Sequence, residues 1–448
     1  MNLLALAMMS MKKSGVTIAM TLPSGLSQPL PPLWLLLPFA LQLLAIALLP
    51  FLNLHWWEQH YAKVSAFLAG ITLFYYLAIM GETHRPLESL HEYVSFIILM
   101  AALFIVAGGI HIGVKERTTP GMNLLFLIVG ALLANVIGTT GASMLLIRPW
   151  IRMNRARIAG FHTMFFIFLI SNIGGCLTPI GDPPLFLGFL KGVPFWWTLR
   201  HLWQPCFFVI ACLAGAFFLM DRKSYREHCS DSERKISDSG SWRISGLGNL
   251  APLAVILLAI FLPTPWREIV MSLAAITSWR LTPQSIHQEN EFSLAPIKEV
   301  AWLFLGIFAT MMPALDYLEH HAEGIARSLG MGSTHFYYFT GILSSLLDNA
   351  PTYLSFLSVE MGLQGGSMNH PADVLRVATS DPVHLIAISL GAVFFGAMTY
   401  IGNGPNFMVK SIVSASGVKT PSFFGYLFQY SLPILLPILV LAGWLFLR

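Results

Sequence analysis

Apolar residues occur along this chain in long, nearly uninterrupted runs, not in the alternating patterns of half-buried helices and strands. An α-helix needs about 17–25 mainly apolar residues to cross a lipid bilayer. The runs that meet this length most clearly are 33–54, 61–81, 93–113, 201–220 and 424–447. Weaker runs lie at about 247–263, 266–281 and 298–314, and the second of these is short. The pattern predicts an all-α, polytopic membrane protein.

Composition supports this class of protein. The 448 residues are 55% hydrophobic and 11% charged, with a mean hydropathy of +0.67, whereas a soluble domain has about 25% charged residues. The net charge of +4 is small and scattered, so nucleic acid is not an expected partner. The cysteines form no CxxC pair and are expected to be apolar fillers, not disulfides or metal ligands; they are Cys176, Cys206, Cys212 and Cys229.

One long polar stretch, DRKSYREHCSDSERKISDSGSW at 221–242, divides the chain and has no apolar periodicity, so we expect it to be a loop. The first residues contain Met11-Lys12-Lys13 before a short apolar core, which leaves open a cleaved signal or a disordered segment. The predicted organisation is an N-terminal segment, a first membrane repeat, a cytoplasmic linker and a second membrane repeat, at 1–30, 31–220, 221–246 and 247–448.

The two halves contain matching motifs. GCLTPIGDPPLF, from Gly175, aligns with GAMTYIGNGPNF, from Gly396, and Asp182 then faces Asn403. Upstream in each half, LLAN (132–135) matches LLDN (346–349). Interrupted hydrophobic segments at corresponding places in two halves are the best sequence pointer to the binding site of a transporter.

The LLxN motifs lie in apolar segments, 122–147 and 336–359, that polar, Gly or Pro residues interrupt midway. A straight span would hold these groups at bilayer mid-depth, at a cost unless protein or water satisfies them; a re-entrant hairpin is the alternative. Basic residues bracket the first segment, as expected for cytoplasmic ends; they are Lys115, Arg117, Arg148, Arg152, Arg155 and Arg157.

The flanks of the second segment, 316–335 and 360–382, carry only Arg327 and Arg376 against six acidic residues. This difference predicts that the second hairpin enters from the outside, so that the two repeats are inverted. Lys191 and Arg200 fall outside in this scheme and count against it.

The matched motifs should also break a helix. Proline lacks the N–H that continues a helix but is favourable at the first helical position, so we expect unwinding at 178–182 and a new helix at Pro183 and Pro184. The residues expected to permit such breaks in both halves are Gly138, Gly141, Gly181, Pro183, Gly402, Gly404 and Pro405. Unwound carbonyls between half-helices can form an ion site inside a membrane.

Asp182 and Asp348 are the candidate ion-binding residues. An aspartate at mid-bilayer costs about 2.5–3.5 kcal/mol, which is tolerable where the carboxylate pairs with a cation or a proton. Sodium is the metal ion expected at both, with oxygen ligands from nearby polar residues: Asn135, Thr139, Thr140, Asn349, Thr352, Thr178, Thr399 and Asn403, and as second choices Ser143, Asn172 and Asn406. Each Thr or Asn could instead serve helix packing. His111, His162 and His384 are expected to be solvated at span ends.

The segments ANVIGTTGASMLLIRP, SNIGGCLTPIGDPPLFLGFL, SSLLDNAPTYLSFL and TYIGNGPNFMVKSI resemble the signature segments of the ion transporter superfamily. Within it they are most similar to NhaD-type sodium/proton antiporters and citrate-transporter-like permeases. The resemblance covers the chain from about residue 90 onward. It implies two inverted repeats, each with a re-entrant hairpin and a discontinuous helix, an elevator-type mechanism, a homodimer and a bacterial inner membrane.

The resemblance leaves the substrate open. Members that carry carboxylates have Ser-Asn-Thr hairpin tips, whereas the tips here are 135–140 and 348–352. Antiporter members carry aspartates that match Asp182 and Asp348, but also an early acidic cluster that is not found here. The expected function is therefore sodium (or other monovalent cation)/proton antiport, and the alternative is a cation-coupled permease for citrate, dicarboxylates or other anions.

A third possibility is an intramembrane enzyme or a structural protein. Against the enzyme, the sequence contains no HExxH or GxSxG motif. No resident cofactor is expected, since sodium and protons would be transported. The expected partners are the lipid bilayer, a small ion or carboxylate, and a second copy of the chain.

Overall fold

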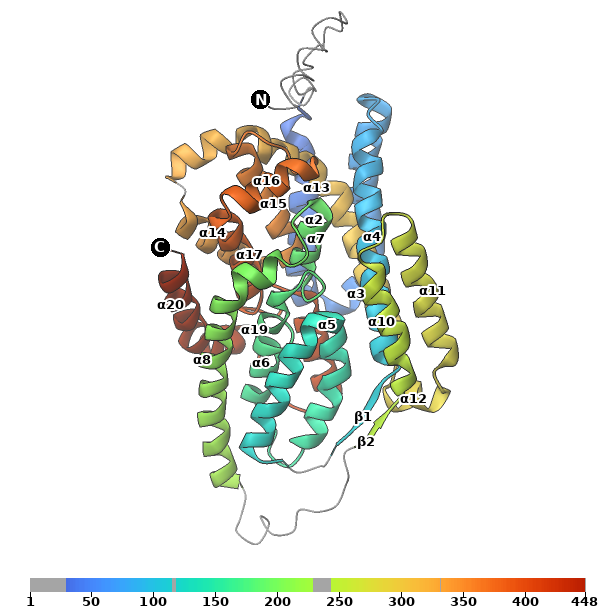
Figure 1. Ribbon diagram of the computed structural model, residues 1–448, viewed down its shortest axis with the longest axis vertical. Helices are drawn as coiled ribbons and strands as arrows, with labels where there is room; N and C mark the ends of the chain where they lie inside the picture. Colours follow the sequence, from blue (N-terminus) through green and yellow to red (C-terminus); the bar gives the residue numbers. More distant parts are fainter. Residues whose placement is uncertain (1–29, 115–117, 229–242, 331, 448) are drawn as a thin grey trace, which may run out of the picture. The chain divides into compact units, whose positions relative to one another are not determined.

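The computed structural model describes residues 30–114, 118–228, 243–330 and 332–447, and most of them are helical (Figure 1). The N-terminal segment, for which a signal peptide was considered, and Cys229 lie outside the described residues. Cys176 and Cys206 are buried and unpaired in disulfides, as expected of apolar fillers.

The helices of the first half are α2 (Leu37–Leu52), α3 (Leu54–Phe74), α4 (His84–Gly108), α5 (Pro120–Met153), α6 (Gly160–Leu169), α7 (Pro183–Lys191) and α8 (Trp197–His228). Short 3-10 turns precede α2 and lie between α6 and α7, as η1 (Leu33–Leu36) and η3 (Ile173–Leu177). A π-helical turn, η2 (Tyr75–Ile79), ends α3.

The helices of the second half are α10 (Leu250–Ala259), α11 (Trp266–Leu281), α12 (Gln284–Glu289), α13 (Ala295–Leu329), α14 (Ser333–Leu346), α15 (Asn349–Leu363), α16 (Pro371–Ser380), α17 (Val383–Gly396), α18 (Gly404–Ala415), α19 (Phe423–Tyr426) and α20 (Leu436–Phe446). The turn η4 (Leu247–Asn249) leads into α10, and the π-helical η5 (Leu427–Leu435) joins α19 to α20.

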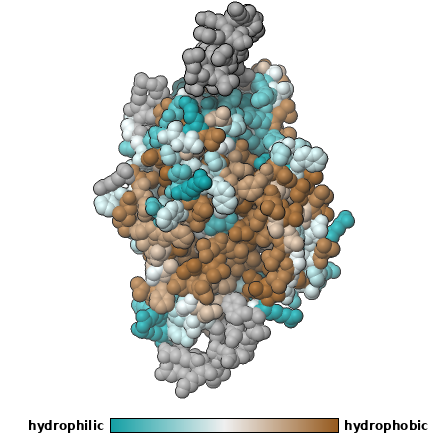
Figure 2. Space-filling model, in the orientation of Figure 1, coloured by the Kyte–Doolittle hydropathy of each residue, from teal (hydrophilic) through white to brown (hydrophobic). Residues whose placement is uncertain are grey.

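Among the described residues, eight helices are long and apolar enough to cross a membrane, or nine if α16 and α17, bent by 101°, count as one span. Apolar side chains form a broad band on the face shown in Figure 2, with polar side chains gathered at both ends. These features confirm a multi-pass α-helical membrane protein.

The weak run at 266–281 is a helix, α11, but its 16 residues cover only about 24 Å, less than the ~30 Å hydrocarbon core. It packs beside α10 and against α4. Its Glu268 accepts a hydrogen bond from Ser95 of α4 at 2.6 Å and pairs with Arg267 at 2.9 Å. Two spans were expected here. The structure has two short helices, α10 and α11, and neither is long enough to count as a membrane span.

Two groups of neighbouring helices meet along an extensive contact within one packed body. The first contains α2, α3, α4, α10, α11 and α13, and the second contains α5 to α8 and α14 to α20. In Figure 1, α4, α10 and α11 lie to one side of α5, and α8 and α20 lie to the other. The groups meet mainly where α4 packs on α5 and α13 packs on α15.

Both interrupted LLxN segments fold back on themselves. In α5 the chain reverses at Gly138 (φ 76°, ψ 155°), so that Asn123 Nδ2 donates to Asn154 Oδ1 at 2.7 Å across the base. We call this unit hairpin 1. Hairpin 2 consists of α14 and α15, with Leu347 and Asp348 at the tip and the rings of Phe336 and Phe356 6.3 Å apart.

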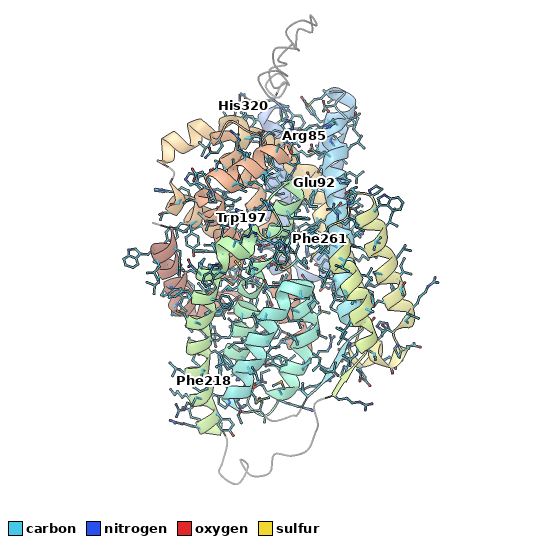
Figure 3. All side chains as sticks on the ribbon, in the orientation of Figure 1. Arg85, Glu92, Trp197, Phe218, Phe261 and His320 are labelled. Atoms are coloured by element: carbon cyan, nitrogen blue, oxygen red, sulfur yellow. The ribbon has the colours of Figure 1, made fainter. Side chains whose placement is uncertain are left out.

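The two hairpins approach opposite ends of α8. Near the end of α8, Asp221 accepts a hydrogen bond from Asn123 at the base of hairpin 1 at 2.9 Å. At its start, Trp197 donates to the carbonyl of Ala378 in α16, which follows hairpin 2, at 2.8 Å. Trp197, the first residue of α8, and Phe218, further along it near Asp221, are labelled in Figure 3. The 25 residues from Trp197 to Asp221 cover about 36 Å of helix.

Both ends of the predicted linker 221–246 belong to secondary-structure elements. Its first eight residues continue α8 to His228. Its end contains strand β2 (Arg243–Ser245), which pairs antiparallel with β1 (His111–Gly113) so that Ile112 faces Ile244. The described part of the fold is therefore helical apart from this small ribbon, which ties the end of α4 to the start of α10.

Candidate functional site

Four helix N-termini meet around the carboxylate of Asp182. Asp182 itself is the N-cap of α7, and it accepts a hydrogen bond from Thr139, the first residue after the reversal in α5, at 2.9 Å. Asn403, the N-cap of α18, donates to the same oxygen at 2.9 Å. Asn349, the first residue of α15, donates to the other oxygen at 2.7 Å. Residues from both hairpins and both helix breaks thus converge on one side chain.

Asp182 is 1% exposed, so its charge must be balanced within the protein. The amides of Asn349 and Asn403 donate to it, as an ionised carboxylate requires. The N-terminal end of a helix also carries a partial positive charge, and here four such ends face one carboxylate. The arrangement stabilises a negative charge deep among the helices.

The two halves make the same backbone contact between hairpin tip and helix break. The N–H of Thr139 donates to the carbonyl of Gly181 at 2.7 Å, and the N–H of Asn349 donates to the carbonyl of Gly402 at 3.1 Å. Thr139 therefore corresponds to Asn349, and Gly138 to Asp348. The sequence match of LLAN with LLDN pairs Asn349 with Asn135, which lies four residues before Thr139, so it is out of register by four residues. The sequence match of the two break motifs pairs Gly181 with Gly402, as the structure does.

Several predicted ligands make hydrogen bonds that hold the breaks together. The hydroxyls of Thr178 and Thr399 donate to the carbonyls of Asn135 and Ser345, at 2.6 and 2.7 Å. Each also accepts a hydrogen bond from the glycine N–H three residues on, at 3.2 Å. The amide of Asn135 bridges Gly174 O and Leu177 N. The hydroxyl of Thr352 donates to its own helix at Asp348 O, at 2.9 Å.

The structure requires glycine at some of the predicted break positions and not at others. Gly138 has a positive φ, and a Cβ on Gly181 or Gly402 would lie 2.0 or 2.5 Å from a carbonyl oxygen. Gly141 and Gly404 have neither restriction: the nearest atoms to an added Cβ lie 3.6 Å away at Gly141, and none lies within 4 Å at Gly404. Pro183 and Pro405 occupy the first turns of α7 and α18, as predicted.

Unused oxygen atoms remain beside Asp182. Asn349 is fully buried, yet its Oδ1 has no hydrogen-bond partner among the residues that the structure describes. Asp348 is half-buried and caps α15 by accepting from the N–H of Ala350 at 3.0 Å. Thr140 lines, with Gly138 and Ile180, a cavity of about 10 Å³, enough for about one water-sized particle.

No group of three or more His, Cys, Asp or Glu side chains capable of holding a metal ion occurs in the described ranges. The available donors are oxygen atoms of two carboxylates, amides and carbonyls, which suit a hard cation.

The second-choice residues form a layer behind the site. Asn172 Oδ1 accepts from Asn403 at 3.2 Å, and its Nδ2 donates to Asn406 Oδ1 at 2.7 Å. Ser143 bonds Ser171 at 2.7 Å. Asn172 therefore orients the amide that contacts Asp182, a role that its position outside the aligned motifs did not indicate.

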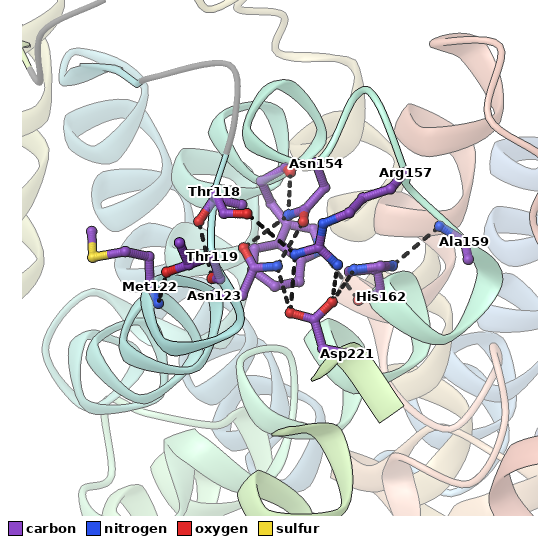
Figure 4. A network of polar contacts seen from close by, with 10 residues as sticks. Thr118, Thr119, Met122, Asn123, Asn154, Arg157, Ala159, His162 and Asp221 are labelled. Carbon is purple, nitrogen blue, oxygen red and sulfur yellow. Dashed lines mark hydrogen bonds and ion pairs between the residues drawn. The ribbon is translucent and has the colours of Figure 1, made fainter. Parts of the chain in front are cut away.

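The prediction that the three histidines are simply solvated is wrong for His162. Its ring is fully buried and lies 3.1 Å from Asp221, which also pairs with Arg157 (Figure 4). His384 is partly exposed and lies 2.8 Å from the buried Glu360. His111 is near the surface, with Nδ1 2.8 Å from Asn290 Oδ1. The sequence pattern placed Asp221 in a loop, and burial of an ion pair there had no local signal.

Lys191, whose position counted against the predicted orientation, is neutralised. Its Nζ lies 2.5 Å from Glu92 of α4, labelled in Figure 3, and 3.0 Å from Asn369 Oδ1. Membrane orientation depends on the excess of Lys and Arg in exposed loops, so a buried lysine paired with a glutamate contributes little to it.

A family model described as "Putative citrate transport" matches residues 28–447, nearly the whole chain. No curated protein matches the chain.

Proposed function

The chain belongs to the putative citrate transport family, and from that premise we propose that this membrane transporter exchanges a monovalent cation, sodium in the simplest case, for protons at Asp182. The family points to a transporter and not to an enzyme. The proposal rests chiefly on one observation: a single fully enclosed carboxylate lies where both hairpins and both helix breaks meet.

One carboxylate is sufficient to couple the two fluxes. An ionised Asp182 attracts a cation, whereas a protonated Asp182 has no charge to offer, so each species must leave before the other binds. The unpartnered Oδ1 of Asn349 and the carboxylate of Asp348 belong to the same hairpin tip and are the proposed additional cation ligands. Sodium and protons are then substrates, and no resident cofactor takes part.

We further propose an inverted arrangement, because the two ends of α8 differ in charge. Arg222, Lys223 and Arg226 are exposed at the end beside the base of hairpin 1. At the end that follows hairpin 2, α16 carries Asp373 in its first turn and Arg376, and Asp381 follows its last residue, so this end has no excess of basic residues. Because cytoplasmic ends carry the excess of Lys and Arg, hairpin 1 is assigned to the cytoplasmic side and hairpin 2 to the outside, most simply of a bacterial inner membrane.

The two helix groups suggest how access could alternate. In an elevator-type cycle, the group that holds the site, α5 to α8 and α14 to α20, would slide along the other group. The contacts of α4 on α5 and of α13 on α15 would be the sliding surfaces. Pairing with a second copy stays a prediction of the resemblance.

The alternative is a cation-coupled permease for citrate or another anion. The description of the family favours it, and so do four helix N-termini, since such ends bind anionic groups. Against it, the carboxylate of Asp182 already occupies those ends and would repel a carboxylate substrate. The cavity at the tip of hairpin 1, about 10 Å³, also has no room for citrate in this conformation.

The deciding experiment uses purified protein in liposomes with a pH-sensitive dye and an imposed pH gradient. Sodium, lithium, potassium and citrate are added separately, with empty liposomes and an Asp182→Asn variant as controls. Dissipation of the gradient by sodium or lithium alone supports antiport at Asp182. Dissipation by citrate alone would replace antiport with the permease.

A further inference from the structure

The base of hairpin 1 is fastened by a buried charge network (Figure 4). Asp221 of α8 accepts from Asn123 of the first arm at 2.9 Å, and Asn123 donates to Asn154, just after the second arm, at 2.7 Å. Arg157 pairs with the same carboxylate. His162, at the start of α6, completes the contact at 3.1 Å. Both arms, the following helix and α8 are thus joined through Asp221.

Only one protonation state of His162 satisfies the hydrogen bonds of this network. The backbone N–H of Ala159 donates to His162 Nδ1 at 3.1 Å, so Nδ1 carries no proton and Nε2–H donates to Asp221. His162 is therefore neutral, and the charge that balances Asp221 comes from Arg157, which stays protonated at any physiological pH. The base of hairpin 1 should not respond to pH.

The base of hairpin 2 is fastened differently. Glu360, near the end of α15, is fully buried; its Oε1 accepts from Gln364 at 3.0 Å, and its Oε2 lies 2.8 Å from His384 Nδ1 of α17. Within the described parts of the chain, His384 is the cationic partner found for Glu360. A carboxylate near a helix C-terminus also faces the negative end of its own helix. This buried charge therefore depends on a histidine.

His384 can take up a proton where His162 cannot. Its Nδ1 faces Glu360, so Nδ1–H donates, and Nε2 is the nitrogen available for a second proton. The side chain is 24% exposed, against 0% for His162. The charged groups that act on it are Glu360 from α15 and Asp381 from the turn before α17, while α14 contributes the ring of Phe336, stacked at 4.7 Å.

We propose that Glu360 and His384 are a positioning pair that clamps the base of hairpin 2 when His384 is protonated and releases it when the proton leaves. Protonation at Nε2, by a proton from the adjoining solution, converts a hydrogen bond into an ion pair and holds α15 on α17. Asp348 and Asn349 lie at the opposite end of α15, so the clamp sets how firmly the tip is held at Asp182. The inference rests on the proposed function in taking hairpin 2 as part of the transport site and its base as facing the outside.

The first test measures transport in oriented proteoliposomes at fixed internal pH. An unperturbed histidine titrates near pH ~6.5, and the neighbouring Glu360 carboxylate favours the protonated form of His384, so external pH is varied from about 6 to about 9. The wild-type rate should rise about threefold with the external pH, beyond the effect of the changed proton gradient. His384→Gln keeps a hydrogen-bonding group but no charge, and should remove this rise. His384→Arg carries a permanent charge, and should hold the rate at the low value throughout.

The matched control is His162→Gln at the base of hairpin 1, which should leave the response to external pH as in the wild type. A response of wild-type size in His384→Gln would overturn the proposal, as would a response abolished equally by His162→Gln.

The second test does not require transport. Spin labels at Thr334 of α14 and His91 of α4, both exposed, are placed in a background without native cysteines, and their distance distribution is measured at both pH values. A distribution that broadens at the higher pH in the wild type but not in His384→Arg supports the clamp. Identical distributions at both pH values would refute it. If sodium transport fails while this change persists, the proposed function is wrong and the clamp stands.

Discussion

The two half-sites share a backbone and differ in where they place a carboxylate. In each, a hairpin tip donates an N–H to the carbonyl of a broken helix, Thr139 to Gly181 and Asn349 to Gly402. In the first half, Gly138 is at the tip and Asp182 at the break. In the second, Asp348 is at the tip and Asn403 at the break. The acid therefore lies at the break in the first half and at the tip in the second.

This difference separates what builds the site from what acts in it. The backbone contact occurs twice because each half needs the same device to fasten a tip to a break. The enclosed carboxylate occurs once, since Asn403 Nδ2 donates to Asp182 at 2.9 Å, and an aspartate at 403 would place two negative charges in contact. A repeated scaffold thus holds a single titratable centre, with Asp348 half-buried at its edge.

The largest effect is expected for Asp182→Asn, which makes the two breaks chemically alike. Interactions with a charged group are worth about 1.5–3 kcal/mol each, so cation-driven proton flux should fall about a hundredfold or more. The measurement is the liposome dye assay, with the amount of protein in the membrane as the control for expression. A variant that transports at the wild-type rate would remove Asp182 from the mechanism.

Exchanging the pair tests whether position matters as well as charge. The double variant Asp182→Asn/Asn403→Asp restores one acid and one amide to the same contact, from the other helix. We expect about tenfold more flux than in Asp182→Asn alone, because four helix N-termini still face the restored carboxylate. The comparison would fail if the double variant were as inactive as the single one, with both folded by size-exclusion chromatography.

Asp348→Asn should act on cation binding more than on turnover. Asparagine caps a helix about as well as aspartate, so α15 keeps its N-cap bond to Ala350 while losing the charge. The KM for the cation should rise about tenfold with a smaller change in kcat. Asp348→Ala, which also loses the cap, is the informative control, since it alone should lower thermal stability. An unchanged KM in Asp348→Asn would confine Asp348 to capping.

The smallest effect concerns the backbone of the tips. Gly138 has φ 76°, so Gly138→Ala strains the reversal in α5, at a cost of about 1–3 kcal/mol in the free energy of unfolding. Gly404→Ala is the matched control at the start of α18, where an added Cβ meets no atom within 4 Å. Thermal unfolding in detergent should show a lower midpoint for the first variant only. Equal midpoints would mean that the tip of hairpin 1 tolerates a side chain at position 138.

Much of the site could be predicted from the sequence because its signals are local. Pro183 and Pro405 favour the start of a helix and cannot continue a preceding one, by their own covalent structure, and both lie where expected, in the first turns of α7 and α18. Asp182 and Asp348 were singled out because a charge in an apolar run needs a partner. The register between the halves was predicted less well: LLAN and LLDN look alike, but Thr139, four residues beyond Asn135, makes the contact that Asn349 makes.

Contacts between distant segments gave no such signal. His162, Arg157 and Asp221 were assigned to span ends and a loop, yet they form one buried network. Asn135 and Thr178 were predicted as ligands, and in this structure their polar atoms hydrogen-bond to the backbone at a break. Nothing in the residue pattern distinguishes an asparagine that binds an ion from one that binds a carbonyl.

The sequence by itself determined the class of protein, the places where helices break and the presence of two acids inside apolar runs. These follow from hydrophobic length and from the backbone limits of proline and glycine, which act within a few residues. Only the tertiary structure decided which oxygen atoms face Asp182, which acid is enclosed and which histidine is locked neutral. These depend on packing between segments up to more than two hundred residues apart, such as Asn403 against Asp182, where side-chain contacts are set by the whole fold.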